Sequence, residues 1–183
     1  MEFTNEQKLI VALLTEIHKE LDIENGLDPE FIQDKVSSGN TWALRWKYPG
    51  LFQDSVEPPE NVKFVADVLD LWERLEQSHA ALNQEGIATL NTLSQMGERV
   101  RFPGFDGNGS DYDGYSIARI MIEELERWST FRGRDLNAHM PMADAYRRML
   151  NASQSLGKGH WDYEFSVEEM AEILNAWIHP DNR

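Results

Sequence analysis

The stretch PPENVKFVADVLDLWERLEQSHAAL, residues 58–82, decides the fold of this chain. Pro58 and Pro59 come just before Glu60, and proline suits a helix start because its fixed φ fits the first turn and no N–H is needed there. Apolar residues then recur every three or four positions, which is the period of one helix face. That face comprises Val62, Val65, Ala66, Leu69, Trp72, Leu75, His79 and Leu82. The pattern predicts the longest helix of the protein, with His79 as a hydrogen-bonded core histidine rather than a ligand.

Capping motifs predict helices through the rest of the chain. Thr4 and Gln7 have the spacing of a capping box, and Ser166 and Glu169 repeat it near the other end. Together with apolar periods, these motifs predict helices near residues 5–21, 29–38, 42–46, 84–96, 113–131, 141–150 and 167–178. The first of these helices carries aliphatic residues at helical spacing, namely Leu9, Ile10, Leu13, Leu14, Ile17 and Leu21.

Only one segment, RVRFPGF at residues 99–105, has the alternation of a strand. One strand cannot form a sheet by itself. The sequence therefore predicts an all-α, multihelical protein with at most one short extended segment near 99–105. The Pro/Glu/Ser-rich stretch 53–60 is the best candidate for an internal boundary. We predict two packed helical subdomains, residues 1–57 and 58–183, that form a single domain.

The chain of 183 residues contains no cysteine. This excludes disulfides, thiolate zinc sites, iron–sulfur clusters and cysteine nucleophiles, and it fits a reducing cytoplasm. The first residues, MEFTNEQK, lack the basic start and apolar core of a signal peptide, and the apolar run LIVALL is far too short to cross a bilayer. We expect a soluble, cytoplasmic protein with no membrane partner.

The formal charge of −15 is unevenly distributed. Residues 1–98 carry 18 acids against 7 bases, residues 99–148 carry 8 against 8, and residues 149–183 carry 6 against 2. Such an acidic chain would be repelled by DNA, so no nucleic-acid partner is expected. All eight bases of the middle segment are arginines, which suit fixed ion pairs. They predict either internal pairs with the local acids or a surface that meets an acidic partner, such as a second copy.

Several motifs resemble those of the YfbU-like family of bacterial proteins. They are MEFTNEQKLI at the start, GFDGN at 104–108, GY at 114–115, RWSTF at 127–131 and NAHMPM…YRRML at 137–150. The similarity extends over most of the chain in the same order, and it is weakest between about residues 22 and 97. The resemblance implies a multihelical, cytoplasmic, bacterial protein that self-associates. It implies no reaction, because the family has no established catalytic residues.

The stretch GRDLNAHMPM, residues 133–142, allows two interpretations. Pro141 would begin a helix with Met140 at the cap, and methionine cannot cap, so nearby polar groups could fold back onto the main chain. In the functional alternative, His139 is a general base held by Asp135. Arg132, Arg134 and Asn137 are then the candidate ligand-binding residues.

The loop DGNGSDYDGYSI, residues 106–117, partly matches a calcium-binding loop. Asp106, Asn108 and Ser110 have the required spacing, but Asp111 replaces the glycine of position six and Ile117 the glutamate of position twelve. We therefore predict an Asx-turn loop with Asp113 as helix cap, and no metal site.

A predicted helix over residues 113–131 would be about 28 Å long at 1.5 Å per residue. The loops that contain Asp106 and His139 would then leave from opposite ends. A joint site would need a long fold-back or two chains packed antiparallel.

Trp42, Trp46 and Phe52 form an apolar cluster with Leu51 that predicts either core packing or a partner interface. The chain has no phosphate-binding loop, dinucleotide fingerprint, nucleophile elbow or zinc-spaced histidine pair, so no cofactor is expected. The sequence therefore favours a non-enzymatic, homo-oligomeric interaction or regulatory module. The alternative is a small-molecule enzyme or ligand-binding protein that uses the 132–139 loop.

Overall fold

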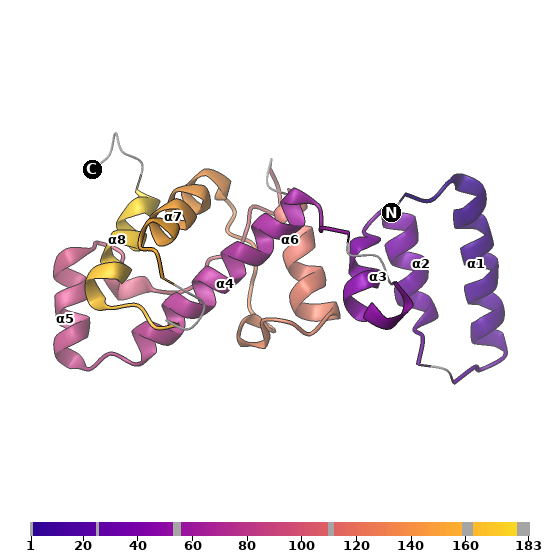
Figure 1. The fold of residues 1–183 in the computed structure, drawn as a ribbon, viewed down its shortest axis with the longest axis horizontal. Coiled ribbons are helices and arrows are strands. Elements are labelled where there is room, and N and C mark those ends of the chain that lie inside the picture. The colour runs from indigo at the N-terminus through magenta and orange to yellow at the C-terminus, as the bar shows by residue number, and fades with distance from the viewer. Residues whose placement is uncertain (1, 25, 53–55, 110–111, 159–162, 179–183) are drawn as a thin grey trace. The chain divides into compact units, whose positions relative to one another are not determined.

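The computed structural model describes residues 2–24, 26–52, 56–109, 112–158 and 163–178. These residues form eight α-helices and no strand, so the predicted all-α fold is confirmed (Figure 1). The helices group into two compact units, residues 1–59 and 60–183. The boundary follows residue 59, where the sequence suggested residue 57.

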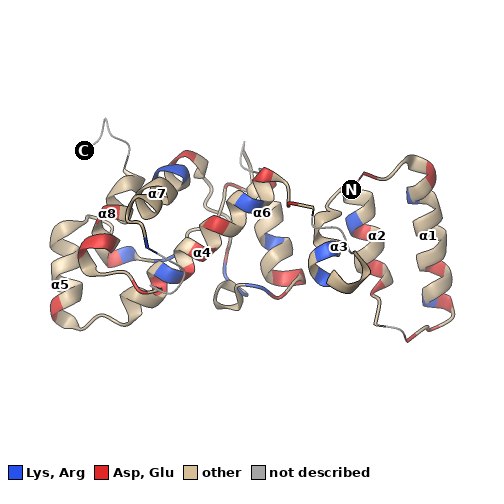
Figure 2. Cartoon of the chain, viewed as in Figure 1, with Lys and Arg blue, Asp and Glu red and all other residues tan. Residues whose placement is uncertain are grey.

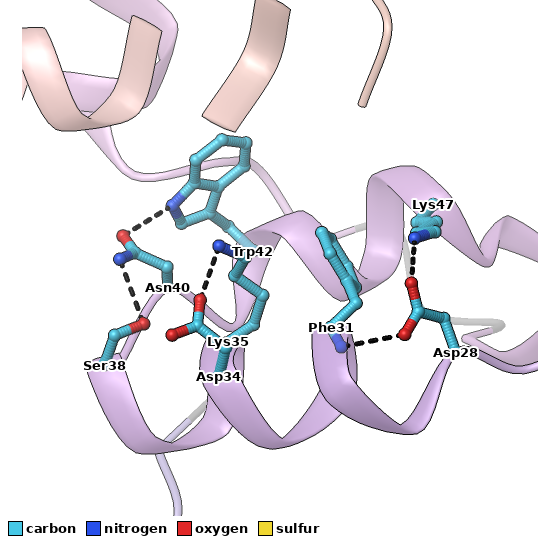
Figure 3. A network of polar contacts seen from close by, with 8 residues as sticks. All are labelled: Asp28, Phe31, Asp34, Lys35, Ser38, Asn40, Trp42 and Lys47. Atoms are coloured by element: carbon cyan, nitrogen blue, oxygen red, sulfur yellow. Dashed lines mark hydrogen bonds and ion pairs between the residues drawn. The ribbon is translucent and has the colours of Figure 1, made fainter. Parts of the chain in front are cut away.

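Unit 1 contains α1 (Asn5–Glu20), α2 (Pro29–Ser38) and α3 (Trp42–Lys47). The predicted capping box of α1 is present. At the start of α2, the Asp28 carboxylate accepts a hydrogen bond from the Phe31 amide at 3.0 Å and an ion pair from Lys47 at 3.0 Å (Figure 3). Gly39 ends α2 in the left-handed conformation, with φ of +81°. Local capping chemistry therefore sets the limits of both helices.

Unit 2 is built on α4 (Glu60–Ala80), the long helix that the sequence predicted. Val68, Leu69, Trp72 and Leu75 are fully buried along one side of it. Lys, Arg, Asp and Glu are interspersed on the rest of α4 (Figure 2). The other helices of this unit are α5 (Gln84–Leu93), α6 (Tyr112–Arg119), α7 (Ala143–Ser155) and α8 (Val167–Trp177). Helix α8 packs against both α5 and α7, and α4 packs against α6 and α7.

The core of unit 2 is an aromatic cluster drawn from distant parts of the sequence. Phe102 is its centre, with ring centroids 6.1 Å from Trp72, 5.8 Å from Phe105, 5.0 Å from Phe131 and 6.2 Å from Tyr146. Offset and edge contacts of this kind add to the stabilisation from burial alone. The cluster therefore fixes the 99–105 segment against α4 and α7.

The predicted helix over residues 113–131 is wrong beyond Glu124. Helix α6 continues as a single π-turn, Ile120–Glu124, and a 3₁₀ turn follows at Ser129–Phe131. Between them Glu126 and Trp128 have positive φ values of 54° and 47°. The Trp128 indole donates to Asp70 at 2.7 Å, so tertiary contacts with α4 hold this bend and override helix propensity.

Two predicted helix starts also differ. Asp113 lies within the first turn of α6 rather than at its cap. Helix α7 begins at Ala143, with Met142 at the cap position and no side-chain cap bond, two residues later than the predicted start at Pro141. The backbone before α7 turns at His139, whose φ is +54°, and the His139 amide donates to Asn137 Oδ1 at 2.9 Å.

Candidate functional site

The loops that contain Asp106 and His139 lie side by side in unit 2. The Phe105 amide donates to the Leu136 carbonyl at 2.9 Å, and the Ala138 amide donates to the Phe105 carbonyl at 2.9 Å. Phe105 and Asn137 thus form an isolated parallel bridge. The prediction that these loops leave opposite ends of one helix is wrong, because the helix stops at Glu124 and the chain folds back.

Asn137 joins the two loops through its side chain. Its Oδ1 accepts hydrogen bonds from the Gly107 amide at 3.0 Å and the His139 amide at 2.9 Å. The Asp135 carboxylate in turn accepts from the Asn137 amide at 2.9 Å. Asp135 and Asn137 thus fold back onto the main chain, as one interpretation predicted, but they bond loop amides rather than the first amides of α7.

The predicted catalytic pair is not assembled. Both Asp135 and His139 are among the described residues, and no hydrogen bond joins their side chains. His139 Nδ1 instead lies 3.3 Å from Asn108 Nδ2. A catalytic role for these two residues stays a prediction.

The two candidate ligand-binding arginines make internal ion pairs. Arg132 lies 3.1 Å from Glu126. Arg134 donates to both carboxylate oxygens of Glu76 at 2.8 and 2.9 Å, and Glu76 also accepts from the Phe102 amide at 2.7 Å. Arg134 therefore links the 132–139 loop to α4 and to the aromatic core.

The calcium-like loop begins with an Asx turn, as the non-metal interpretation predicted. Asp106 is buried and its Oδ1 accepts from the Asn108 amide at 3.0 Å. Ser110 and Asp111 lie outside the described residues. Within the described part of the chain, no group of three or more His, Cys, Asp or Glu side chains could hold a metal ion.

A pocket of about 630 Å³ lies beside Asp135 and Asn137. Its wall is completed by His79 at the end of α4, by residues 96 and 98–103, and by Trp177 at the end of α8. Arg99 and Arg101 belong to this wall, while Arg132, Arg134 and His139 do not. Strand alternation in the sequence does not account for the two wall arginines, since Arg99 ends a 3₁₀ turn and Val100 lines the same pocket.

His79 differs from the hydrogen-bonded core histidine that the sequence predicted. The residue is only partly buried, and its Nε2 atom is buried without a hydrogen-bond partner among the described residues. A buried polar atom without a partner is uncommon in folded proteins, so His79 is an unusual residue in the wall of this pocket.

The tryptophan cluster of unit 1 contains one core residue and two that are partly buried. Trp42 is buried and meets Trp46 edge-to-face with ring centroids 5.4 Å apart. Figure 3 shows the Trp42 indole donating to Asn40. Trp42, Trp46 and the partly buried Phe52 also line a pocket of about 480 Å³ within this unit. Trp42 is thus a core residue, and an interface role for the cluster stays a prediction.

Helix α1 packs beside α2 (Figure 1), and its less exposed residues are Lys8, Val11, Ala12, Thr15 and His18. Thr15 is its one buried residue, and Thr15 Oγ1 lies 3.0 Å from Gln33 Oε1. Lys19 pairs with Glu30 at 2.7 Å. The six aliphatic residues that predicted this helix are all exposed, with exposed fractions of 52–65%. An apolar face of this kind is normally buried, so its exposure needs an explanation.

These features define an all-α protein of two helical units, and no helix in its described part is long and apolar enough to cross a membrane. The model of the YfbU domain matches residues 1–176, and the chain belongs to this family. A UPF0304 protein of Methanocaldococcus jannaschii is 28% identical over 124 residues, which are 65% of this chain and 69% of that relative. The predicted family resemblance is confirmed. Neither name specifies a reaction.

Proposed function

We propose that this protein is a non-enzymatic interaction module that self-associates through the apolar face of α1. The observation that carries the proposal is the exposure of seven aliphatic residues at the start of the chain. Their exposed fractions are 61% for Leu9, 56% for Ile10, 53% for Leu13, 59% for Leu14, 52% for Ile17, 65% for Leu21 and 42% for Ile23.

The six residues within and just after α1 form one continuous face. At 3.6 residues per turn they fall within an arc of about 140°. Along the helix axis, the part of this face between Leu9 and Ile17 carries no charged residue. Glu6 and Glu20 lie beyond its two ends. An apolar centre with a polar rim is the usual composition of a protein interface.

The size of this face suits a second copy of the chain. Full burial of one aliphatic side chain contributes about 1.5–3 kcal/mol. Only 52–65% of each of these side chains is still exposed, so the twelve side chains of two faces would contribute roughly 10–20 kcal/mol. The cost of association is about 4–15 kcal/mol. A twofold pairing supplies the apolar surface from both sides, and the uncharged centre prevents like charges from meeting there.

A hollow between α1 and α2 extends the face. It has a volume of about 200 Å³ and an almost entirely apolar wall that includes Leu14, Leu27 and Ile32. A side chain from the facing copy could fill this hollow, as buried anchors do in stable interfaces.

Sedimentation velocity on three forms of the full chain tests the proposal. We expect the wild type to be oligomeric and the variant Leu13→Lys/Ile17→Lys to be monomeric with unchanged far-UV circular dichroism. Leu51→Lys is the matched control, since Leu51 is 62% exposed in the same unit but lies outside α1, and it should remain oligomeric. A wild type that is monomeric at every concentration, or a double variant with wild-type mass, would refute the proposal.

A further inference from the structure

We propose that the 630 Å³ pocket of unit 2 binds a small zwitterion that carries an apolar ring, the chemistry of an aromatic amino acid. The volume falls within the range of about 300–1,000 Å³ that is usual for small-molecule sites. This inference goes beyond self-association and uses none of the residues of α1. It rests on three features of the pocket wall.

The first feature is the unpartnered nitrogen of His79. Its Nε2 is buried and has no hydrogen-bond partner among the described residues, while the residue itself lines the pocket. An imidazole nitrogen either donates or accepts, depending on its tautomer, so it can meet an ammonium, a carboxylate or a ring substituent. Because protein atoms cover Nε2, a polar group of the ligand pairs with it once the imidazole ring turns toward the pocket.

The second feature is a balance of unlike charges on the same wall. The guanidinium groups of Arg99 and Arg101 make no ion pair with any described residue, unlike Arg132 and Arg134 of the neighbouring loop. An arginine without an ion pair suits a carboxylate, which its guanidinium group binds through two parallel hydrogen bonds.

The acidic members of the wall are Glu98 and Asp135. Asp135 uses one oxygen, Oδ1, to accept from the Asn137 amide, which holds the carboxylate in place. A purely anionic ligand would be repelled by these two carboxylates, and a purely cationic one by the two guanidinium groups. A molecule that carries an ammonium and a carboxylate matches both pairs.

The third feature is a rigid apolar surface. Trp177 meets Trp72 edge-to-face at 5.8 Å and Tyr146 at 6.0 Å, so contacts with the aromatic core hold its ring. Phe102, the centre of the aromatic core, and Met96 complete this part of the wall. Flat rings and thioethers pack well on a planar apolar group, which gives the ring of the ligand its place.

Isothermal titration of the full chain with four matched probes tests the assignment. L-Phenylalanine carries the ring and both charges, 3-phenylpropionate lacks the ammonium, 2-phenylethylamine lacks the carboxylate, and L-alanine lacks the ring. We expect L-phenylalanine to bind at least tenfold more tightly than each of the other three. Equal binding of 3-phenylpropionate or 2-phenylethylamine would overturn the zwitterion, and no binding of any probe at millimolar concentration would overturn the site.

Variants then locate the binding. Arg99→Ser and Arg101→Ser alter exposed residues, and each should weaken L-phenylalanine binding at least fivefold; His79→Leu should do the same. Arg132→Ser is the control, because Arg132 is an exposed arginine of the same unit that lies outside the pocket. The affinity of this variant for L-phenylalanine should stay within twofold of the wild-type value. Arg99→Ser and Arg101→Ser variants that bind as the wild type does would refute the assignment even if His79→Leu fails to fold.

Discussion

Gly104 lies against the Leu136 carbonyl so closely that no side chain fits between them. A Cβ atom on Gly104 would fall 2.0 Å from the Leu136 oxygen, and the backbone there has φ of +93°. The Gly104 carbonyl also accepts a hydrogen bond from the Tyr146 hydroxyl at 2.5 Å. Gly104 therefore allows the loops that contain Asp106 and His139 to pair, and its carbonyl links them to α7.

Replacement of this glycine should destabilise the protein strongly. We expect Gly104→Ala to lower the free energy of unfolding by more than about 3 kcal/mol, because strain from the positive φ adds to a main-chain clash. Gly133→Ala is the control: its φ is +72° and nothing lies within 4 Å of the added Cβ, so only about 1–2 kcal/mol should be lost. Urea unfolding of both variants measures the difference, and equal losses would contradict the close approach.

The regular helices were predictable from the sequence because their signals are local. The capping boxes at Thr4 and Ser166 and the apolar period of α4 each lie within a few turns, and each predicted helix is present. The bend after Glu124 was not predictable in this way. It depends on contacts of Trp128 with Asp70, which is 58 residues away in the sequence.

The 630 Å³ pocket of unit 2 could not be predicted from the sequence for the same reason. His79, Arg101, Asp135 and Trp177 come from four separate segments, and no local pattern connects them. The sequence did identify Asp135 and Asn137, since a polar loop before a proline is unusual on local grounds. Likewise, the spacing of the α1 aliphatics predicted the helix but could not show that their face is exposed, because α2 meets the opposite side.

The ion pair between Arg134 and Glu76 should stabilise unit 2 more than an exposed pair does. Their side chains are only 24% and 18% exposed, and Glu76 also accepts a hydrogen bond from the Phe102 amide. We expect Arg134→Ala to cost about 1.5–3 kcal/mol. Arg147→Ala breaks a pair whose side chains are 62% and 87% exposed, so it should cost less than about 1 kcal/mol. Chemical denaturation of both variants compares them, and indistinguishable values would contradict the role assigned to Glu76.

Asp28 should make the stability of unit 1 depend on pH. The hydrogen bond from the Phe31 amide is the largest cause that lowers the pKa of Asp28 below its ordinary value of 3.8, and Lys47 acts in the same direction against partial burial. A lowered pKa in the folded state gives stability that is present above 3.8 and lost as the pH falls through the folded value.

The matching variant is Asp28→Asn, which keeps an oxygen at the helix cap but carries no charge. It should be less stable than the wild type near neutral pH by about 0.5–1 kcal/mol, since the ion pair with Lys47 is partly exposed. The difference should shrink as acid protonates the wild-type carboxylate. Thermal unfolding followed across the acid range measures it, and a difference that stays constant with pH would rule out the linkage.

Amide hydrogen exchange should reveal whether α1 depends on a second copy. Helix α1 has one buried residue, Thr15, whereas α2 buries Phe31, Lys35 and Val36, so α1 alone has little to oppose local opening. Association through the apolar face would protect its amides by mass action. We therefore expect exchange from residues 9–20 to slow as protein concentration rises, while exchange from α2 changes much less. In the Leu13→Lys/Ile17→Lys variant the concentration dependence should vanish. Protection of α1 that is the same at micromolar and at near-millimolar protein would mean that its apolar face stays open to solvent.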